Sequence, residues 1–191
     1  MARAGLSEDR VVEEAERMAD EVGLQRLTLA ALAERLGVRQ PSLYKHIDGL
    51  PALHRTIAVR ARVELADVLG RAAVGRSRGD AIRSVATTYR AWALEHPGRY
   101  SATLRAPDPG DTDDVAASTA AVSVVLEILS GYDLRDDAAI DAARALRSSL
   151  HGFVSLEAAG GFGLPVDIDR SFERLVDGLI VALDAMTAPV P

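Results

Sequence analysis

The segment Leu27–Leu53, LTLAALAERLGVRQPSLYKHIDGLPAL, decides the fold of the N-terminal part of this chain. Thr28 is a favourable N-cap residue, and it predicts a short helix over 29–36 that Gly37 terminates. A second helix is expected over 40–46, with Pro41 near its first turn, where proline is tolerated. Two short helices that meet at a glycine indicate a helix-turn-helix. The side chains expected to pack the two helices together are Ala30, Ala33, Leu36, Val38, Leu43 and Ile47.

The second of these helices carries polar side chains suited to DNA. In a helix-turn-helix this helix lies in the major groove with its N-terminal residues at the base edges. Gln40 can hydrogen-bond a base edge, often that of adenine, and Arg39 can reach guanine or a phosphate. Four more side chains offer hydrogen-bond donors to phosphate oxygens: Ser42, Tyr44, Lys45 and His46. Taken singly, Tyr44 could instead cap a core and His46 could be a solvated surface residue.

The spacing of these residues resembles the DNA-binding domain of the TetR family of bacterial repressors over about residues 7–60. The resemblance rests on the pattern Thr28, Ala33, Gly37-Val38, Pro41-Ser42-Leu43-Tyr44 and His46. It implies that seven residues face DNA, namely Thr28, Arg39, Gln40, Ser42, Tyr44, Lys45 and His46. The chain departs from the family at Ile47, where relatives usually carry an aromatic residue, and at Leu50, where they carry a phosphate-binding lysine. Some relatives also have a basic residue near Ala30, which this chain lacks.

The rest of the chain also has helical patterns, and no strand-length run alternates apolar with polar residues. The further helices are expected over 8–22, 51–74, 80–95, 100–105, 113–130, 136–159 and 167–185. The prediction is an all-α protein of about nine helices. We expect a DNA-binding domain over 1–50, with three helices, and a ligand-binding and dimerisation domain over 51–191.

Composition and charge limit the classes of function. The net charge of −6 argues weakly against nucleic-acid binding, but residues 1–60 hold nine basic and nine acidic residues, so the excess of acid lies in the remainder. The chain has no cysteine, which excludes disulfides, thiolate metal sites and cysteine nucleophiles. No signal peptide or membrane span is evident, so a soluble cytoplasmic protein is expected.

An enzyme and an interaction protein that no longer binds DNA are the alternative classes. An acidic cluster is formed by Asp108, Asp111, Asp113 and Asp114, while His96 and His151 could act as bases. However, aspartates in a loop and at a helix start are favoured for capping, and no catalytic or nucleotide-binding spacing is present. We therefore predict no catalytic residues, no metal site and no cofactor.

The C-terminal part resembles the ligand-binding and dimerisation part of the same family, though loosely. The resemblance implies that the last two helices pair with those of a second copy into a homodimer, which would bind a near-palindromic operator. A pocket for a largely apolar small molecule is expected to be lined by Tyr89, Trp92, His96, Tyr100, Leu104, Leu126 and Phe153, although each could simply fill core. Arg90, Arg147 or His151 could anchor an acidic ligand. The family habit implies a repressor that a small-molecule effector releases from DNA, with the long helix over 51–74 transmitting the change.

Overall fold

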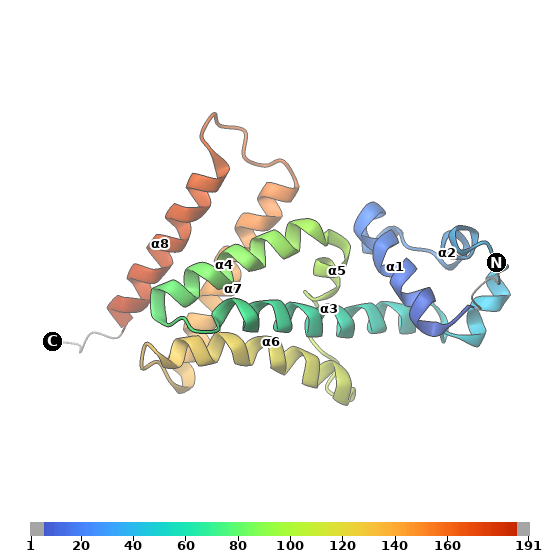
Figure 1. Ribbon diagram of the computed structural model, residues 1–191, viewed down its shortest axis with the longest axis horizontal. Helices are drawn as coiled ribbons and strands as arrows, with labels where there is room; N and C mark the ends of the chain where they lie inside the picture. The colour runs from blue at the N-terminus through green and yellow to red at the C-terminus, as the bar shows by residue number, and fades with distance from the viewer. Residues whose placement is uncertain (1–5, 187–191) are drawn as a thin grey trace. The chain divides into compact units, whose positions relative to one another are not determined.

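The computed structural model describes residues 6–186, and within that range every regular element is a helix (Figure 1). The eight α-helices are α1 (Glu8–Val22), α2 (Leu29–Leu36), α3 (Gly49–Ala73), α4 (Arg78–Glu95), α5 (Pro97–Ala102), α6 (Thr112–Ser130), α7 (Asp136–Ala158) and α8 (Ile168–Met186). Two short 3-10 helices, η1 (Leu24–Arg26) and η2 (Gln40–Lys45), precede and follow α2. The predicted all-α class is confirmed, and the predicted number of helices is close to the number found.

Local signals fix the ends of the first helices. The Ser7 hydroxyl accepts a hydrogen bond of 3.3 Å from the backbone N–H of Arg10 and caps α1. The Thr28 hydroxyl caps α2 in the same way, accepting 3.3 Å from the N–H of Ala31. Gly37 ends α2 with φ 69°, a left-handed conformation that favours glycine, and its N–H bonds the carbonyls of Ala33 and Glu34. These caps explain why the predicted bounds of α2 are correct.

Two predicted details of the short helices are wrong. Residues 40–45 form a 3-10 helix rather than an α-helix. The backbone N–H of Ser42 donates to the carbonyl of Arg39, three residues earlier, and the N–H of His46 donates to the carbonyl of Leu43, each at 2.8 Å. The predicted turn over 100–105 is in fact α5, which begins at Pro97, directly after α4. The 3-10 helix η1 was not predicted.

The chain forms two compact units. The head unit consists of the residues up to Val63 together with Glu95–Ser118, and the body unit consists of Glu64–Leu94 together with the residues from Thr119 onward. Helices α3 and α6 each contribute residues to both units. The expected functional division at residue 50 is a separate matter and stays a prediction.

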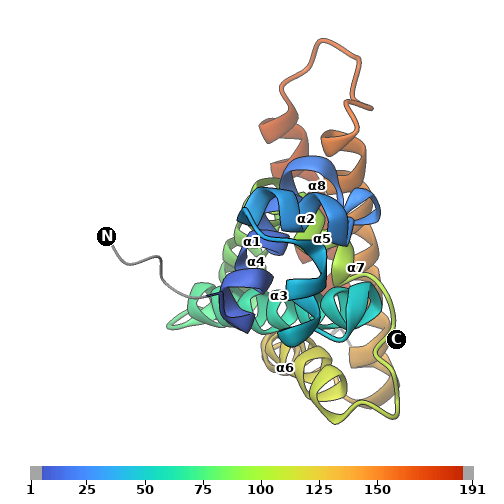
Figure 2. The same cartoon turned by 90° about the vertical axis from the view of Figure 1, so that its right-hand side faces the viewer.

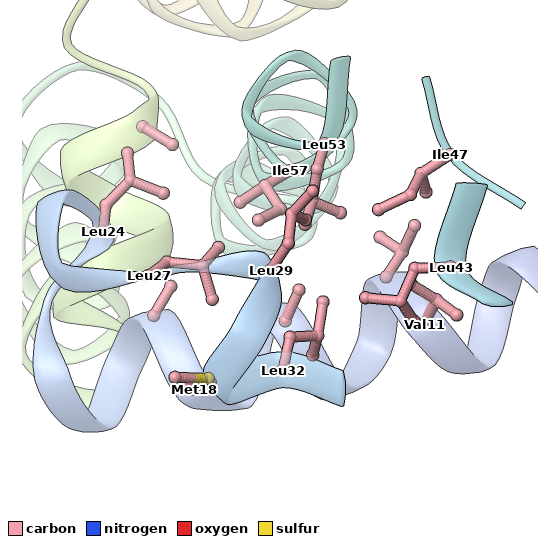
Figure 3. Packing of buried hydrophobic residues seen from close by; sticks show 14 of the residues in the cluster. Val11, Met18, Leu24, Leu27, Leu29, Leu32, Leu43, Ile47, Leu53 and Ile57 are labelled. Atoms are coloured by element: carbon pink, nitrogen blue, oxygen red, sulfur yellow. The ribbon is translucent and has the colours of Figure 1, made fainter. Parts of the chain in front are cut away.

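The core of the head unit gathers apolar side chains from α1, α2, η2 and α3 (Figure 3). Leu32, Leu43 and Leu53 are fully buried, and Val11 of α1 lies beside Leu43. Of the side chains predicted to join the two short helices, Ala33, Leu43 and Ile47 are buried, while Leu36 and Val38 are partly buried against the same core. Ala30 is exposed, so that prediction is wrong; Leu29 and Leu32 take this role, because one turn of helix separates the inward-facing positions.

Helix α5 completes the head unit. It lies against α1 and η1 (Figure 2). A Cβ atom added to Gly98 of α5 would lie 2.1 Å from the carbonyl oxygen of Ala19, so the two helix backbones are in direct contact there. The side chain of Asp20 accepts hydrogen bonds from the backbone N–H and the Nε of Arg99, at 2.8 and 2.7 Å.

The acidic cluster fastens the start of α6 to α3. Arg55 bonds Asp111, and its Nη2 lies 3.1 Å from Asp113. Arg62, whose side chain is 4% exposed, pairs with Asp114, which is fully buried. Asp114 also accepts from Arg105 at 2.8 Å. Three of the four carboxylates of the acidic cluster, those of Asp111, Asp113 and Asp114, are therefore in ion pairs within the head unit.

The body unit is held together by contacts among α4, α7 and α8. Helices α7 and α8 are neighbours joined by a loop (Figure 1). Arg90 of α4 pairs with Glu157 of α7 at 2.6 Å and with Asp169 of α8 at 2.7 Å. Its guanidinium also lies over the ring of Phe172, 4.9 Å from the centroid. Since Arg90 already has two acidic partners, it is not a free anchor for an acidic ligand.

Candidate nucleic-acid interface

The helix-turn-helix is formed by α2, the Gly37 turn and η2. The turn is closed by a 3.0 Å hydrogen bond from the N–H of Val38 to the carbonyl of Ala33. Leu43 anchors η2 in the core, with no solvent exposure. Because one side of so short a helix is buried, its other side chains are directed to solvent.

The predicted DNA-facing residues lie at this surface. Five of them are exposed, namely Thr28, Arg39, Gln40, Tyr44 and Lys45, and two are half-buried, namely Ser42 and His46. Tyr44 is 55% exposed, so the alternative that it caps a core is wrong. The Thr28 hydroxyl accepts from the α2 backbone and therefore keeps its own proton for donation to a phosphate oxygen. Their contacts with DNA stay a prediction.

The charges of the head unit distinguish this surface from the rest of the unit. Among the described residues, Arg39 and Lys45 have no acidic partner within ion-pair distance, and neither does the exposed Arg26 of η1. An unpaired cation can take a phosphate without first losing a carboxylate. By contrast, acids of the same unit neutralise Arg17, Arg35, Arg55, Arg60, Arg62, Arg99 and Arg105.

Arg26 was missed by sequence reasoning. It lies two residues before Thr28, and its position next to the motif is the only feature of the sequence that could have indicated it as a DNA-facing residue. The structure adds that it is exposed between the buried Leu24 and Leu27.

Leu50, the position where relatives carry a lysine, also serves the fold. Its side chain is partly buried against the core of the head unit, in the first turn of α3. It therefore contributes apolar packing instead of a charge. Four residues further along α3, burial lowers the pKa of His54, whose Nε2 is buried without a hydrogen-bond partner among the described residues.

The predicted pocket residues divide between the two units. Tyr89, Trp92, Leu126 and Phe153 belong to the body unit, and His96, Tyr100 and Leu104 belong to the head unit. In the body unit Tyr89 and Trp92 are buried, and the Trp92 Nε1 donates 3.2 Å to the carboxylate of Glu64. Phe153 contacts Phe162 and Phe172 at 4.8 and 5.1 Å between centroids. A ligand site among these residues stays a proposal.

Every regular element in the described part of the chain is a helix, and η2, the second helix of the motif, is exposed and carries cations without acidic partners. These features are typical of a DNA-binding protein of the helix-turn-helix class. A family model described as "Bacterial regulatory proteins, tetR family" matches residues 11–47, and a second, described as "Tetracyclin repressor-like, C-terminal domain", matches residues 82–179. The chain belongs to the TetR family and is an HTH-type transcriptional regulator.

Relatives align over nearly the whole chain. The HTH-type transcriptional regulator Rv0681 of Mycobacterium tuberculosis is 40% identical over 185 residues, which cover 96% of this chain and 84% of that protein. The HTH-type transcriptional regulator YobS of Bacillus subtilis is 36% identical, with 94% of this chain and 95% of that protein covered.

Solved structures share the fold. A protein of unknown function from Rhodococcus sp. RHA1 has a TM-score of 0.79 at 22% identity, covering 95% of this chain and 97% of that chain. A TetR variant from Acinetobacter baumannii AYE, solved in complex with minocycline, has a TM-score of 0.71 at 23% identity, covering 96% and 99%.

Residues 6–186 hold neither a membrane-spanning helix nor a cluster of metal-ligating side chains. No helix there has both the length and the apolar composition needed to cross a membrane. No group of three or more metal-ligating side chains of histidine, aspartate or glutamate gathers in the same range.

Proposed function

We propose that this protein is a repressor whose homodimer binds a near-palindromic operator and releases it when a small-molecule effector binds. One observation carries the DNA-binding part of the proposal. Arg39 and Lys45, at the two ends of η2, are exposed and unpaired, and the exposed Gln40 lies between them. In this proposal Gln40 and Arg39 contact base edges, while Ser42, Tyr44, Lys45, His46 and Thr28 contact phosphates.

We propose that α7 and α8 form the dimer interface. Apolar side chains on both helices are exposed in the single chain, including Ile140, Leu156 and Val181, at 43, 51 and 68%. An added Cβ at Gly152 of α7 or Gly178 of α8 would meet nothing within 4 Å, so these positions allow another helix to approach closely. A two-fold dimer would present two η2 helices to the two half-sites of an operator.

The effector is proposed to bind in the body unit, among Tyr89, Trp92, Leu126 and Phe153. Aromatic and aliphatic side chains favour a largely apolar ligand, and the Glu64 carboxylate beside the Trp92 indole offers one polar contact. Release needs a coupling free energy of only about 1–3 kcal/mol, which weakens operator binding by roughly 5- to 150-fold.

Binding to DNA from upstream of the protein's own gene tests the proposal. Fluorescence anisotropy would compare this duplex with a scrambled one at low and near-physiological salt. We expect tight, selective binding with at least two protomers per site, and equal weak binding to both duplexes would contradict the proposal for that DNA.

A matched pair of double variants locates the interface. Arg39→Ala/Gln40→Ala should abolish the preference for the operator over the scrambled duplex. Arg17→Ala/Gln25→Ala removes the same residue types from exposed positions of the head unit outside η2 and should leave the preference intact. If the two double variants lose selectivity equally, η2 is not the reading element.

A further inference from the structure

The chain contains two Asp–Gly dipeptides, at 48–49 and at 177–178, and it contains no asparagine. An aspartate followed by glycine is a place where the main chain can isomerise, because glycine has no Cβ to hinder attack by its amide nitrogen on the preceding carboxyl group. Both reacting groups must be free of other bonds for this to happen. The two dipeptides differ in this respect.

The dipeptide Asp177–Gly178 is held by other bonds. It lies inside α8, where the N–H of Gly178 belongs to the hydrogen-bond ladder of the helix. The carboxylate of Asp177 lies 2.5 Å from Nη1 of Arg83. The two groups cannot react with each other unless the helix opens and the ion pair breaks.

The dipeptide Asp48–Gly49 lies where the chain passes from η2 to α3, within the head unit. Asp48 is exposed, and its carboxylate makes no hydrogen bond or ion pair within residues 6–186. Gly49 begins α3, so its N–H is among the first amides of the helix, which have no partner in the helical ladder. Its φ of 90° lies in the region that favours glycine. Both reacting groups are therefore free.

Pro51 explains why this carboxylate is free. The residues Ser7 and Thr28, which precede α1 and α2, each accept a capping hydrogen bond from the N–H three positions later. Three positions after Asp48 stands Pro51, which has no N–H to donate. The capping bond of this kind cannot form at the start of α3, so the carboxyl group stays free to approach the amide of Gly49.

We propose that the Asp48–Gly49 bond is a modification site at which aspartate isomerises to isoaspartate. The amide nitrogen of Gly49 attacks Cγ of the protonated Asp48 carboxyl group. A bond from nitrogen to Cγ forms, and the carboxyl hydroxyl leaves with the amide proton as water. Water then opens this cyclic succinimide: attack at Cγ restores aspartate, whereas attack at the backbone carbonyl carbon leaves the chain linked through Cβ and Cγ. The co-reactant is water, and mass is unchanged overall.

The modification alters the junction that positions η2. Isoaspartate adds one carbon atom to the main chain between Ile47 and Leu53, which are both buried in the core of the head unit (Figure 3). Because packing fixes both side chains, the added length has to be taken up between them, directly after η2. We expect the isomerised protein to bind the operator about tenfold more weakly, as for the loss of a base contact. This consequence rests on the proposed function, whereas the isomerisation does not.

Incubation of the full chain in mildly acidic buffer at physiological temperature tests the modification site. Peptide mapping separates aspartyl from isoaspartyl peptides, and an isoaspartyl methyltransferase with labelled S-adenosylmethionine counts the isoaspartyl groups. We expect isoaspartate to accumulate at Asp48 and not at Asp177. A synthetic peptide of residues 46–55 gives the rate without the fold. Absence of isoaspartate at Asp48 over the time in which this peptide isomerises, or equal amounts at both aspartates, would overturn the proposal.

Pro51→Ala tests the physical cause. Alanine restores an N–H three positions after Asp48, and isomerisation should become about fivefold slower, the factor given by a capping bond of about 1 kcal/mol. Pro109→Ala is the matched control, because Pro109 is an exposed proline of the same unit away from this junction, and it should leave the rate unchanged. Equal rates in the wild type and Pro51→Ala would overturn the assignment of the reactivity to the missing cap.

Anisotropy of a labelled operator duplex measures the consequence. Wild-type protein should lose affinity as isoaspartate accumulates, while Asp48→Glu, which keeps the charge but would have to close a larger ring, should keep its affinity during incubation. If fresh wild-type protein binds no duplex, the proposed function fails, and peptide mapping still decides the modification. If the isomerised protein binds the operator as tightly as fresh protein, the modification stands and its effect on η2 is excluded.

Discussion

Replacing Gly98 by alanine should strongly destabilise the protein, although alanine is the better helix former. The new Cβ would stand 2.1 Å from the Ala19 carbonyl oxygen, whereas ordinary van der Waals contact begins at 3.4 Å. The backbones of α1 and α5 must therefore separate by more than about 1 Å, and a backbone oxygen cannot rotate away as a side chain can.

The size of the effect follows from opposing contributions. Overpacking of this kind costs about 1–3 kcal/mol, with the upper end expected against backbone. The hydrogen bonds from Arg99 to Asp20 weaken as the helices separate, at about 1.5–3 kcal/mol for each bond to a charged group that is lost. Alanine returns about 1 kcal/mol through its helix propensity. The net loss is about 3 kcal/mol, which lowers Tm by about 6–12 °C for a chain of this length.

Thermal unfolding followed by circular dichroism measures this change in Tm, with Gly70→Ala as the control. Gly70 is also a helical glycine, but its added Cβ would lie 3.9 Å from a Val124 methyl carbon, an ordinary contact. Gly70→Ala should therefore raise stability by about 0.5–1 kcal/mol. If Gly98→Ala melts at or above the wild-type temperature, α1 and α5 are not in backbone contact at this position.

Three further predictions concern charges. Lys45→Gln should lower the slope of log affinity against log salt for DNA by about one unit per subunit, measured by anisotropy between roughly 50 and 200 mM salt; an unchanged slope would show that Lys45 meets no phosphate. Arg62→Met should cost about 3 kcal/mol in urea unfolding, because it leaves the fully buried Asp114 with Arg105 as its one cationic partner, whereas Arg60→Met should cost less than about 1 kcal/mol; equal effects would contradict the burial of the pair. Burial lowers the pKa of His54, so the unfolded chain binds the proton more readily. Stability should then decline as pH falls from about 7 through the unfolded histidine value of about 6.5, and His54→Gln should flatten that decline in unfolding midpoints measured at several pH values.

Local features of the sequence were sufficient to predict the longer helices and α2. Ser7, Thr28 and Gly37 act through hydrogen bonds to residues within four positions, so their effect is visible without tertiary structure. The exposed side of η2 could also be predicted, because the burial of Leu43 fixes which side of this short helix faces solvent. Nothing local shows that Pro97 and Gly98, which closely follow the helix predicted over 80–95, begin α5 and that α5 packs against α1.

Contacts between distant residues account for what the sequence did not predict. The aspartates at 108–114 read as helix caps, and one of them does cap: the N–H of Asp114 bonds Asp111 at 3.1 Å. Their pairing with Arg55 and Arg62 spans more than 50 residues, and no spacing rule relates them. The inward face of an eight-residue helix was likewise assigned to Ala30, since two turns define a periodicity poorly.

The net charge of −6 is the wrong quantity by which to judge DNA binding in this chain. Many acids of the head unit are paired inside the unit, as Glu14 and Glu21 are with Arg35, and as Asp111 and Asp113 are with Arg55. Hydrogen bonds from Arg55 hold the pKa of Asp111 below its ordinary value, so that carboxylate stays ionised and keeps the arginine occupied at neutral pH. A phosphate approaching η2 therefore meets mainly Arg39 and Lys45, the cations that the fold leaves unpaired.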